Sequence, residues 1–212
     1  MSAALALPKM YELYSPATKR IADHAKKAAE DLGGGWVHFC QDIYLNGQVL
    51  GSAGVCYALS MVFLSRVKTG AGAFTSYIFS NAGRTQVMDL WTMQKTEVAG
   101  WEKLYLAEAG LRQRYCRRND TLEQIKLLLA IPGYYSVGLT NQYADDTTPL
   151  PEIGSGHAFG VVNAGDKHYL FDPNLGTGAF PGADGPGRML GMLAKYVYKQ
   201  FTKGETLLTR YS

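Results

Sequence analysis

The stretch HAFGVVNAGDKHYLFDPN, residues 157–174, decides the fold class of this chain. Its two halves, HAFGVVN and HYLFDP, have the period-two pattern of β-strands, and the turn-like residues Ala164–Asp166 separate them. The segments YYSVGLT (134–140) and ETLLTRY (205–211) predict two further strands, one on each side of this stretch. The C-terminal half of the chain therefore predicts an antiparallel sheet.

The residues before this sheet have mostly helical patterns. Ser15 and Pro16 have the sequence of a helix start, with serine as the N-cap and proline at the first helical position. Asp120 and Glu123 resemble a capping box. The predicted helices before the sheet cover residues 15–32, 56–68, much of 86–111, and 120–131. One further helix is predicted at residues 190–201, between the last two strands. Helices that precede an antiparallel sheet predict an α+β fold.

Three other segments have weaker patterns. WVHFCQDIYLNG (36–47) is mixed and predicts no clear element. Residues 176–191 contain six glycines and two prolines, which predicts a long loop. The basic run at residues 112–118 is interpreted as a solvated helix end. We expect residues 1–32 to form an N-terminal helical extension and residues 33–212 to form one main domain.

The composition is that of a globular protein. The 212 residues are 47% hydrophobic and 18% charged, with a formal net charge of +3. A chain of this length can bury one sizeable core. The small charge does not indicate nucleic acid, and the longest apolar run, residues 53–64, is shorter than the ~20 residues of a membrane span. We therefore expect no nucleic-acid partner and no integral membrane segment, while the oligomeric state stays unknown.

The three cysteines, Cys40, Cys56 and Cys116, are widely spaced and odd in number. They cannot all form disulfides, no two have the short spacing of a zinc site, and the four histidines are not clustered. We therefore expect reduced thiols in a cytosol-like compartment, no metal and no cofactor.

Cys56 lies where a thiol can become a nucleophile. It follows the small-residue stretch Gly51–Gly54 and opens a predicted helix. The unpaired N–H groups and the positive dipole end of a helix N-terminus favour the thiolate over the thiol. From its position alone, Cys56 is equally compatible with a small buried hydrophobic residue.

His157 and Asp172 are the candidate base and its orienting carboxylate. His157 begins one predicted strand and Asp172 ends the next. A turn centred between Ala164 and Gly165 would place the two residues directly opposite each other on the same side of the hairpin. A carboxylate there can orient an imidazole and stabilise its charged form. A structural histidine and a turn aspartate are the alternative interpretation.

Three sequence blocks resemble one known family. GVCYALSMVFL (54–64), GHAFGVV (156–162) and YLFDPNLG (169–176) are similar to the motif blocks of the YopT-type cysteine peptidases, which include AvrPphB-like effectors. The resemblance covers roughly residues 48–180, and FDPN is its most specific part. It implies a papain-like cysteine protease fold, in which a helical part that carries the nucleophile packs on an antiparallel sheet that carries histidine and aspartate.

The resemblance also implies roles for the candidate residues. Cys56 would attack a peptide carbonyl, His157 would exchange protons, and Asp172 would hold the ring. Papain-like enzymes usually have an amide side chain five or six residues before the cysteine, but Leu50 and Gly51 stand there. We expect the backbone N–H of Cys56 to be one oxyanion donor and favour Gln48 as the other. Such a donor contributes about a hundredfold in rate.

The function expected from this resemblance is proteolysis by a bacterial effector or toxin domain. Its partner would be a protein substrate, such as a signalling protein of a host or target cell. Because the N-terminus lacks the features of a cleavable signal peptide, we expect export by a dedicated secretion system and action in the cytosol of the target cell.

Other functions remain open at this point. The chain could be a peptidoglycan amide hydrolase of the NlpC type, or a deamidase or transferase with the same triad. It could also be a catalytically weak binding module, which the missing upstream amide favours slightly. Cys116 would be a rival nucleophile if the surrounding arginines lowered its pKa, although a solvated basic run is the favoured interpretation.

Overall fold

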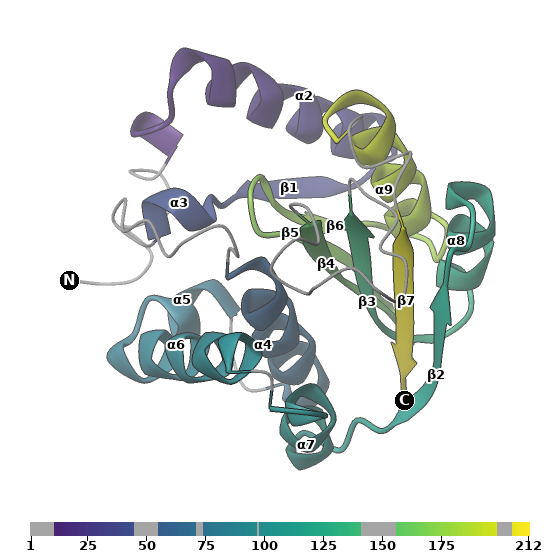
Figure 1. Cartoon of the computed structure of the whole chain (residues 1–212). Coiled ribbons are helices and arrows are strands. Elements are labelled where there is room, and N and C mark those ends of the chain that lie inside the picture. Colours follow the sequence, from purple (N-terminus) through teal and green to yellow (C-terminus); the bar gives the residue numbers. More distant parts are fainter. Residues whose placement is uncertain (1–10, 45–54, 71–73, 97, 141–155, 199–204) are drawn as a thin grey trace.

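The computed structural model describes residues 11–44, 55–70, 74–96, 98–140, 156–198 and 205–212. It shows an α+β fold built on a seven-stranded antiparallel sheet with the strand order β1-β6-β5-β4-β3-β7-β2 (Figure 1). The strands are β1 (Gly35–His38), β2 (Gln113–Arg118), β3 (Gly133–Thr140), β4 (Gly156–Ala164), β5 (Lys167–Asp172), β6 (Gly176–Ala179) and β7 (Thr206–Tyr211).

Helices cover both faces of this sheet (Figure 1). The helices are α2 (Pro16–Asp31), α3 (Gln41–Tyr44), α4 (Cys56–Thr69), α5 (Phe74–Ile78), α6 (Asn81–Lys95), α7 (Trp101–Glu108), α8 (Leu122–Leu129) and α9 (Gly185–Tyr196). Helices α4 to α7 share one hydrophobic core with side chains such as Val162 and Phe171. Helices α8 and α9 share the second core with Phe159 and Val161. Neighbouring strand residues alternate between the two cores, as the pleat of a sheet requires.

Helix α4 is the most deeply buried helix that the structure describes. All but one of the residues from Cys56 to Leu64 are buried, which fits the nearly continuous apolar sequence of this segment. The helix ends at Gly70, whose φ of 64° is the left-handed conformation that glycine adopts without strain. It packs on β4, and the Ser60 hydroxyl donates to Ala158 O at 3.4 Å.

Helix α8 begins one residue later than its sequence suggests. The capping box consists of Thr121 and Gln124, whose side chains bond each other's backbone N–H groups. Asp120 instead accepts two hydrogen bonds from the Arg117 guanidinium, at 2.7 and 2.8 Å. The prediction that Asp120 and Glu123 form the box was therefore wrong, because the neighbouring arginine engages the Asp120 carboxylate.

Two segments form elements other than those that their sequences predicted. The basic run at residues 112–118 contains the edge strand β2, which pairs with β7, and not a helix end. Residues 176–191 contain β6 and the first half of α9, and not one long loop. Strand β6 pairs with β5 on one side and with β1 on the other.

The β4–β5 hairpin sets the geometry of the candidate site. Ala164 pairs with Lys167, so Gly165 and Asp166 are the turn residues, and the ladder extends to the pair Gly160–Phe171. Continuing this register places Asp172 opposite residue 159 rather than opposite His157. The prediction of a directly opposed pair was therefore wrong, because the turn is centred one residue later. The resulting shift is two places along the partner strand, which keeps both side chains on the same face.

Candidate active site

Cys56 is the first residue of α4 and is 8% exposed. The N-cap position is Val55, which makes no side-chain capping hydrogen bond. The first N–H groups of the helix therefore keep their donor capacity at the end that carries the thiol. This is the setting in which a helix stabilises negative charge.

His157 and Asp172 are in direct contact. The Nε2 atom of His157 lies 2.9 Å from Oδ1 of Asp172, and the two side chains are almost completely buried. The contact is diagonal across the hairpin, which side chains of this length can reach. Since Nε2 faces the carboxylate, Nδ1 is the ring nitrogen that is left for a second partner.

The Cys56 thiol lies near enough to the same ring to raise the pKa of His157. The structure thus brings the three predicted residues together. Burial alone would lower the pKa of His157, but the charge and hydrogen bond of Asp172, with a smaller effect of Cys56, raise it to about 10. The raised pKa favours the protonated form of the imidazole at neutral pH.

Tyr198 is a fourth member of this site that the sequence did not reveal. Its hydroxyl donates to both carboxylate oxygens of Asp172, at 3.1 Å to Oδ1 and 2.9 Å to Oδ2. Its ring stacks on the His157 ring with centroids 4.7 Å apart and planes inclined by 24°. The residue lies just after α9, and no local pattern in the segment KYVYKQ marks it.

Asn174 and Gln41 extend the polar network. The Asn174 backbone N–H donates to Oδ1 of Asp172 at 2.8 Å, which is an Asx-type turn. Its side-chain Oδ1 accepts from Nε2 of Gln41 at 2.7 Å, and its Nδ2 lies 3.5 Å from Nδ1 of His157. The DPN sequence carried a turn signal for Asp172, whereas the reach of Gln41 to Asn174 depends on how β1 and α3 pack.

The remaining predicted candidates lie elsewhere. Gln48 lies outside the described residues. Cys116 is exposed on β2, and its sulfur accepts from the Thr209 hydroxyl at 3.5 Å. Cys40 is buried. In the described part of the chain, no three His, Cys, Asp or Glu side chains gather as a metal-binding group. None of the helices described there has the length and apolar character to cross a bilayer.

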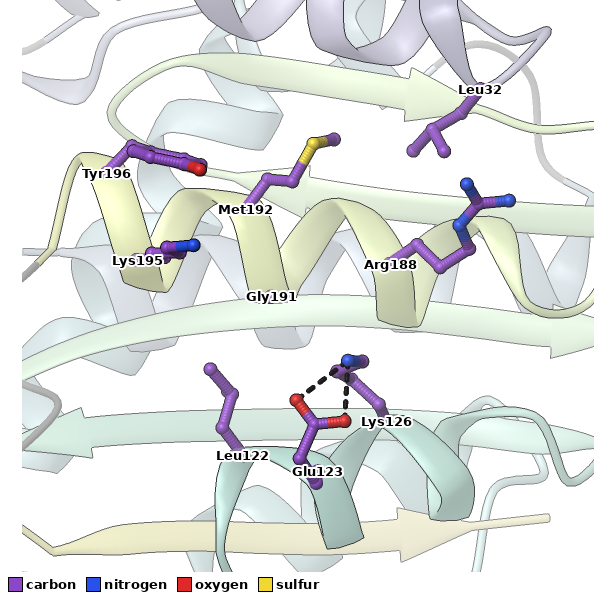
Figure 2. A pocket seen from close by; sticks show the side chains of 9 residues that line it. All are labelled: Leu32, Leu122, Glu123, Lys126, Arg188, Gly191, Met192, Lys195 and Tyr196. Atoms are coloured by element: carbon purple, nitrogen blue, oxygen red, sulfur yellow. Dashed lines mark hydrogen bonds and ion pairs between the residues drawn. The ribbon is translucent and has the colours of Figure 1, made fainter.

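A surface groove lies between α8 and α9, beyond the end of α2 (Figure 2). Its volume is about 610 Å³. Figure 2 shows the Glu123 carboxylate bonded to Lys126 on one wall. The lining residues are Leu32, Leu122, Glu123, Lys126, Arg188, Gly191, Met192, Lys195 and Tyr196. The groove is therefore separate from the site formed by Cys56, His157 and Asp172.

The arrangement of helices and sheet is similar to that of a known protein. The Pseudomonas avirulence protein AvrPphB has a TM-score of 0.52 to this chain and 16% sequence identity, over 74% of this chain and 91% of AvrPphB. The chain has a papain-like fold. The fold that the YopT-type resemblance implied is thereby confirmed.

A second solved structure is similar over most of the papain-like chain. It is PatoxP, a cysteine protease-like domain of the Photorhabdus asymbiotica toxin PaTox, with a TM-score of 0.49 and 13% identity over 92% of this chain and 59% of that chain. No family model matches the sequence, and no curated protein matches it closely.

Proposed function

We propose that this chain is a cysteine peptidase in which Cys56 is the nucleophile, His157 the proton carrier and Asp172 the orienting carboxylate. One observation carries the proposal: a buried imidazole is bonded through Nε2 to a carboxylate at 2.9 Å, and a thiol at a helix N-terminus lies near enough to raise the pKa of the same ring. A nucleophile, a base and a group that orients the base are the parts that thiol acyl transfer requires.

The chemistry follows from these positions. Cys56 attacks as the thiolate of a thiolate–imidazolium pair with His157: its sulfur forms a bond to the peptide carbonyl carbon, and the C=O π electrons move to the oxygen, which becomes an oxyanion. His157 gives its proton to the leaving amine, which leaves an acyl-enzyme. His157 then takes a proton from water, whose oxygen displaces the sulfur and releases a carboxylic acid. We assign the oxyanion donors to the Cys56 backbone N–H and the Gln48 side chain.

We further propose that the chain is a bacterial effector or toxin domain that is exported and acts in the cytosol of a target cell. Its substrate would be a protein there, such as a signalling protein. The fold similarity to an avirulence protein supports this setting, and so does the sequence resemblance of the GHAFGVV and YLFDPNLG blocks.

Cys56→Ala is the decisive variant. We expect it to stay folded and to lose all cleavage, since Cys56 is the cysteine among the described residues that acts on the pKa of His157. Target-cell lysate incubated with the unmodified chain or with Cys56→Ala, followed by mass spectrometry of new peptide termini, measures this loss. Cys116→Ala is the matched control, because it removes an exposed thiol.

The same experiment separates the other enzymatic functions. If the lysate contains deamidated or cross-linked glutamines and no new peptide termini, the chain is a deamidase or a transferase and not a protease. Release of peptides from purified peptidoglycan would favour the NlpC-type activity. Equal cleavage by Cys56→Ala and the unmodified chain would contradict covalent catalysis by this thiol.

A further inference from the structure

Tyr198 contacts two members of the proposed triad at once, through its hydroxyl and through its ring. We propose that Tyr198 is a positioning residue of the active site, in which the hydroxyl fixes the Asp172 carboxylate and the ring fixes the plane of the His157 imidazole. This inference rests on the proposed function and adds a residue on which the Cys56–His157 pair depends.

The hydroxyl meets a need of the carboxylate that other groups do not meet. Asp172 is fully buried, and Oδ1 lies at 2.9 Å from His157 Nε2 and at 2.8 Å from the Asn174 N–H. Among the described hydrogen bonds, Oδ2 has the Tyr198 hydroxyl alone, at 2.9 Å. A buried carboxylate oxygen without a donor is unfavourable, so the anion would gain a proton or turn away from the ring.

The ring of Tyr198 confines the imidazole from one side. It lies nearly parallel to the His157 ring, while Phe159 meets the His157 ring edge-on at 4.7 Å between centroids. Phe159 also contacts Tyr198 edge-on at 5.5 Å. The three rings form one packed cluster, and the face of a tyrosine ring attracts a cationic partner. The stacked arrangement therefore favours both the orientation and the protonated form of His157.

Tyr198 is itself held in place. Its backbone N–H donates to Leu193 O at 2.9 Å, in the last turn of α9, and Val197 N–H donates to the same oxygen. Burial and the Asp172 carboxylate raise the pKa of Tyr198 well above its usual value, so its hydroxyl keeps the proton that it donates. α9 thus delivers a permanent donor to the carboxylate.

The other titratable groups that face the histidine–carboxylate pair do not replace this donor. They are Cys56 at the start of α4 and Tyr14 before α2. The Tyr14 hydroxyl is buried without a hydrogen-bond partner among the described residues. Tyr14 interacts with Asp172 only through the charge of the carboxylate, whereas the Tyr198 hydroxyl donates hydrogen bonds to it.

The test compares Tyr198→Phe with Tyr135→Phe. Both tyrosines are buried, both belong to the second core, and both hydroxyls donate to two oxygens, but those of Tyr135 belong to the backbone of Leu128 and Ile131. Iodoacetamide is added at pH 6 and at pH 10, and mass spectrometry gives the alkylation rate of each cysteine. The exposed Cys116 is the internal standard.

At pH 6 we expect Cys56 in Tyr198→Phe to react about tenfold more slowly than in the unmodified chain, the effect of losing one hydrogen bond to a charged group. At pH 10 the rates converge, because a thiol with an ordinary pKa of ~8.5 ionises there without a histidine. Tyr135→Phe keeps the unmodified rate at both pH values. Equal Cys56 rates in Tyr198→Phe and Tyr135→Phe at pH 6 would overturn the positioning role, as would an equal slowing at both pH values.

The experiment also separates this inference from the proposed function. If Cys56 of the unmodified chain reacts at pH 6 no faster than Cys116, the activated thiol itself is absent and the proposed function fails. If Cys56 reacts fast and Tyr198→Phe leaves its rate unchanged, the proposed function stands and the role of Tyr198 alone fails. Alkylation requires no peptide substrate, so neither result depends on finding the target protein.

Discussion

The hydrogen bond between Nε2 of His157 and Asp172 assigns a different task to each side of the imidazole. In the proposed mechanism Nε2 holds the ring, and Nδ1 exchanges protons with sulfur and substrate. Cys56, His157 and Asp172 could be predicted because each stands at a recognisable boundary of an element. Tyr198 could not, because its partner Asp172 lies 26 residues away and the approach depends on how α9 ends.

Gln48→Ala tests the proposed oxyanion donor at the scale of one residue. An amide that bonds the developing oxyanion stabilises the tetrahedral intermediate, so we expect peptide turnover to fall about a hundredfold. Alkylation of Cys56 by iodoacetamide forms no oxyanion, and its rate should stay unchanged. Steady-state kinetics on the identified substrate and the alkylation assay measure the two effects. Unchanged turnover would exclude Gln48 from the oxyanion site.

At the scale of elements, the long patterned segments could be predicted and the short strands could not. The strands β3, β4, β5 and β7 and the helices α2 and α4 follow their sequence patterns. Strands β1 and β6 have four residues each, with the sequences GWVH and GTGA, which carry no alternation long enough to detect. The pairing of β1 with β6, and of β6 with β5, decides their conformation.

The prediction for the segment that forms edge strand β2 was wrong for another reason. Its sequence QRYCRR has no clear apolar alternation, since four of its six residues are exposed, and charged residues are common on edge strands. The pairing with β7 supplies the backbone hydrogen bonds that its side chains do not predict. The start of α9 was obscured by the glycines and the proline of Gly185–Gly187, which pack at the N-terminus of the helix.

Gly160→Ala tests the contact between α4, which carries the proposed nucleophile, and β4, which carries the proposed base. A Cβ at Gly160 would lie 2.7 Å from a ring carbon of Phe63 and 3.4 Å from Ser60 O, so α4 would have to move away from β4. We expect the variant to lose about 1–3 kcal/mol of unfolding free energy. Its Cys56 should also react more slowly at pH 6, since the thiol and His157 belong to these two elements.

Gly35→Ala on β1 is the matched control, because a Cβ there meets no atom within 4 Å. Urea unfolding and the iodoacetamide assay measure both variants. A Gly160→Ala protein with the stability and Cys56 rate of Gly35→Ala would show that close α4–β4 packing does not set the distance between sulfur and imidazole.

At the scale of the whole molecule, the site forms where elements begin or end. Cys56 opens α4, His157 is near the start of β4, Asp172 ends β5, and Tyr198 follows α9. The two helical layers lie on opposite faces of the sheet, and each contributes one of these side chains. The sheet supplies the buried pair between them. The hydrophobic pattern of a sequence can predict such a layered fold. Only the tertiary structure shows that the ends of these four elements lie close together.

The pH dependence of global stability follows from the buried pair. Folding raises the pKa of His157 from 6.5 to about 10, chiefly through Asp172, although burial opposes this shift. A raised pKa means that the folded state holds the proton more tightly, so this contribution to stability is complete below about pH 6.5 and disappears as the pH rises through 10. Asp172→Asn removes the main cause. We therefore expect the difference in unfolding free energy between the unmodified chain and Asp172→Asn to be largest at pH 6 and to shrink toward pH 10.5 in urea unfolding.

Asp120→Asn is the control, because the partner of Asp120 is Arg117, which does not titrate in this range. If the loss of unfolding free energy in Asp172→Asn changes with pH no more than the loss in Asp120→Asn, His157 is not charged in the folded protein.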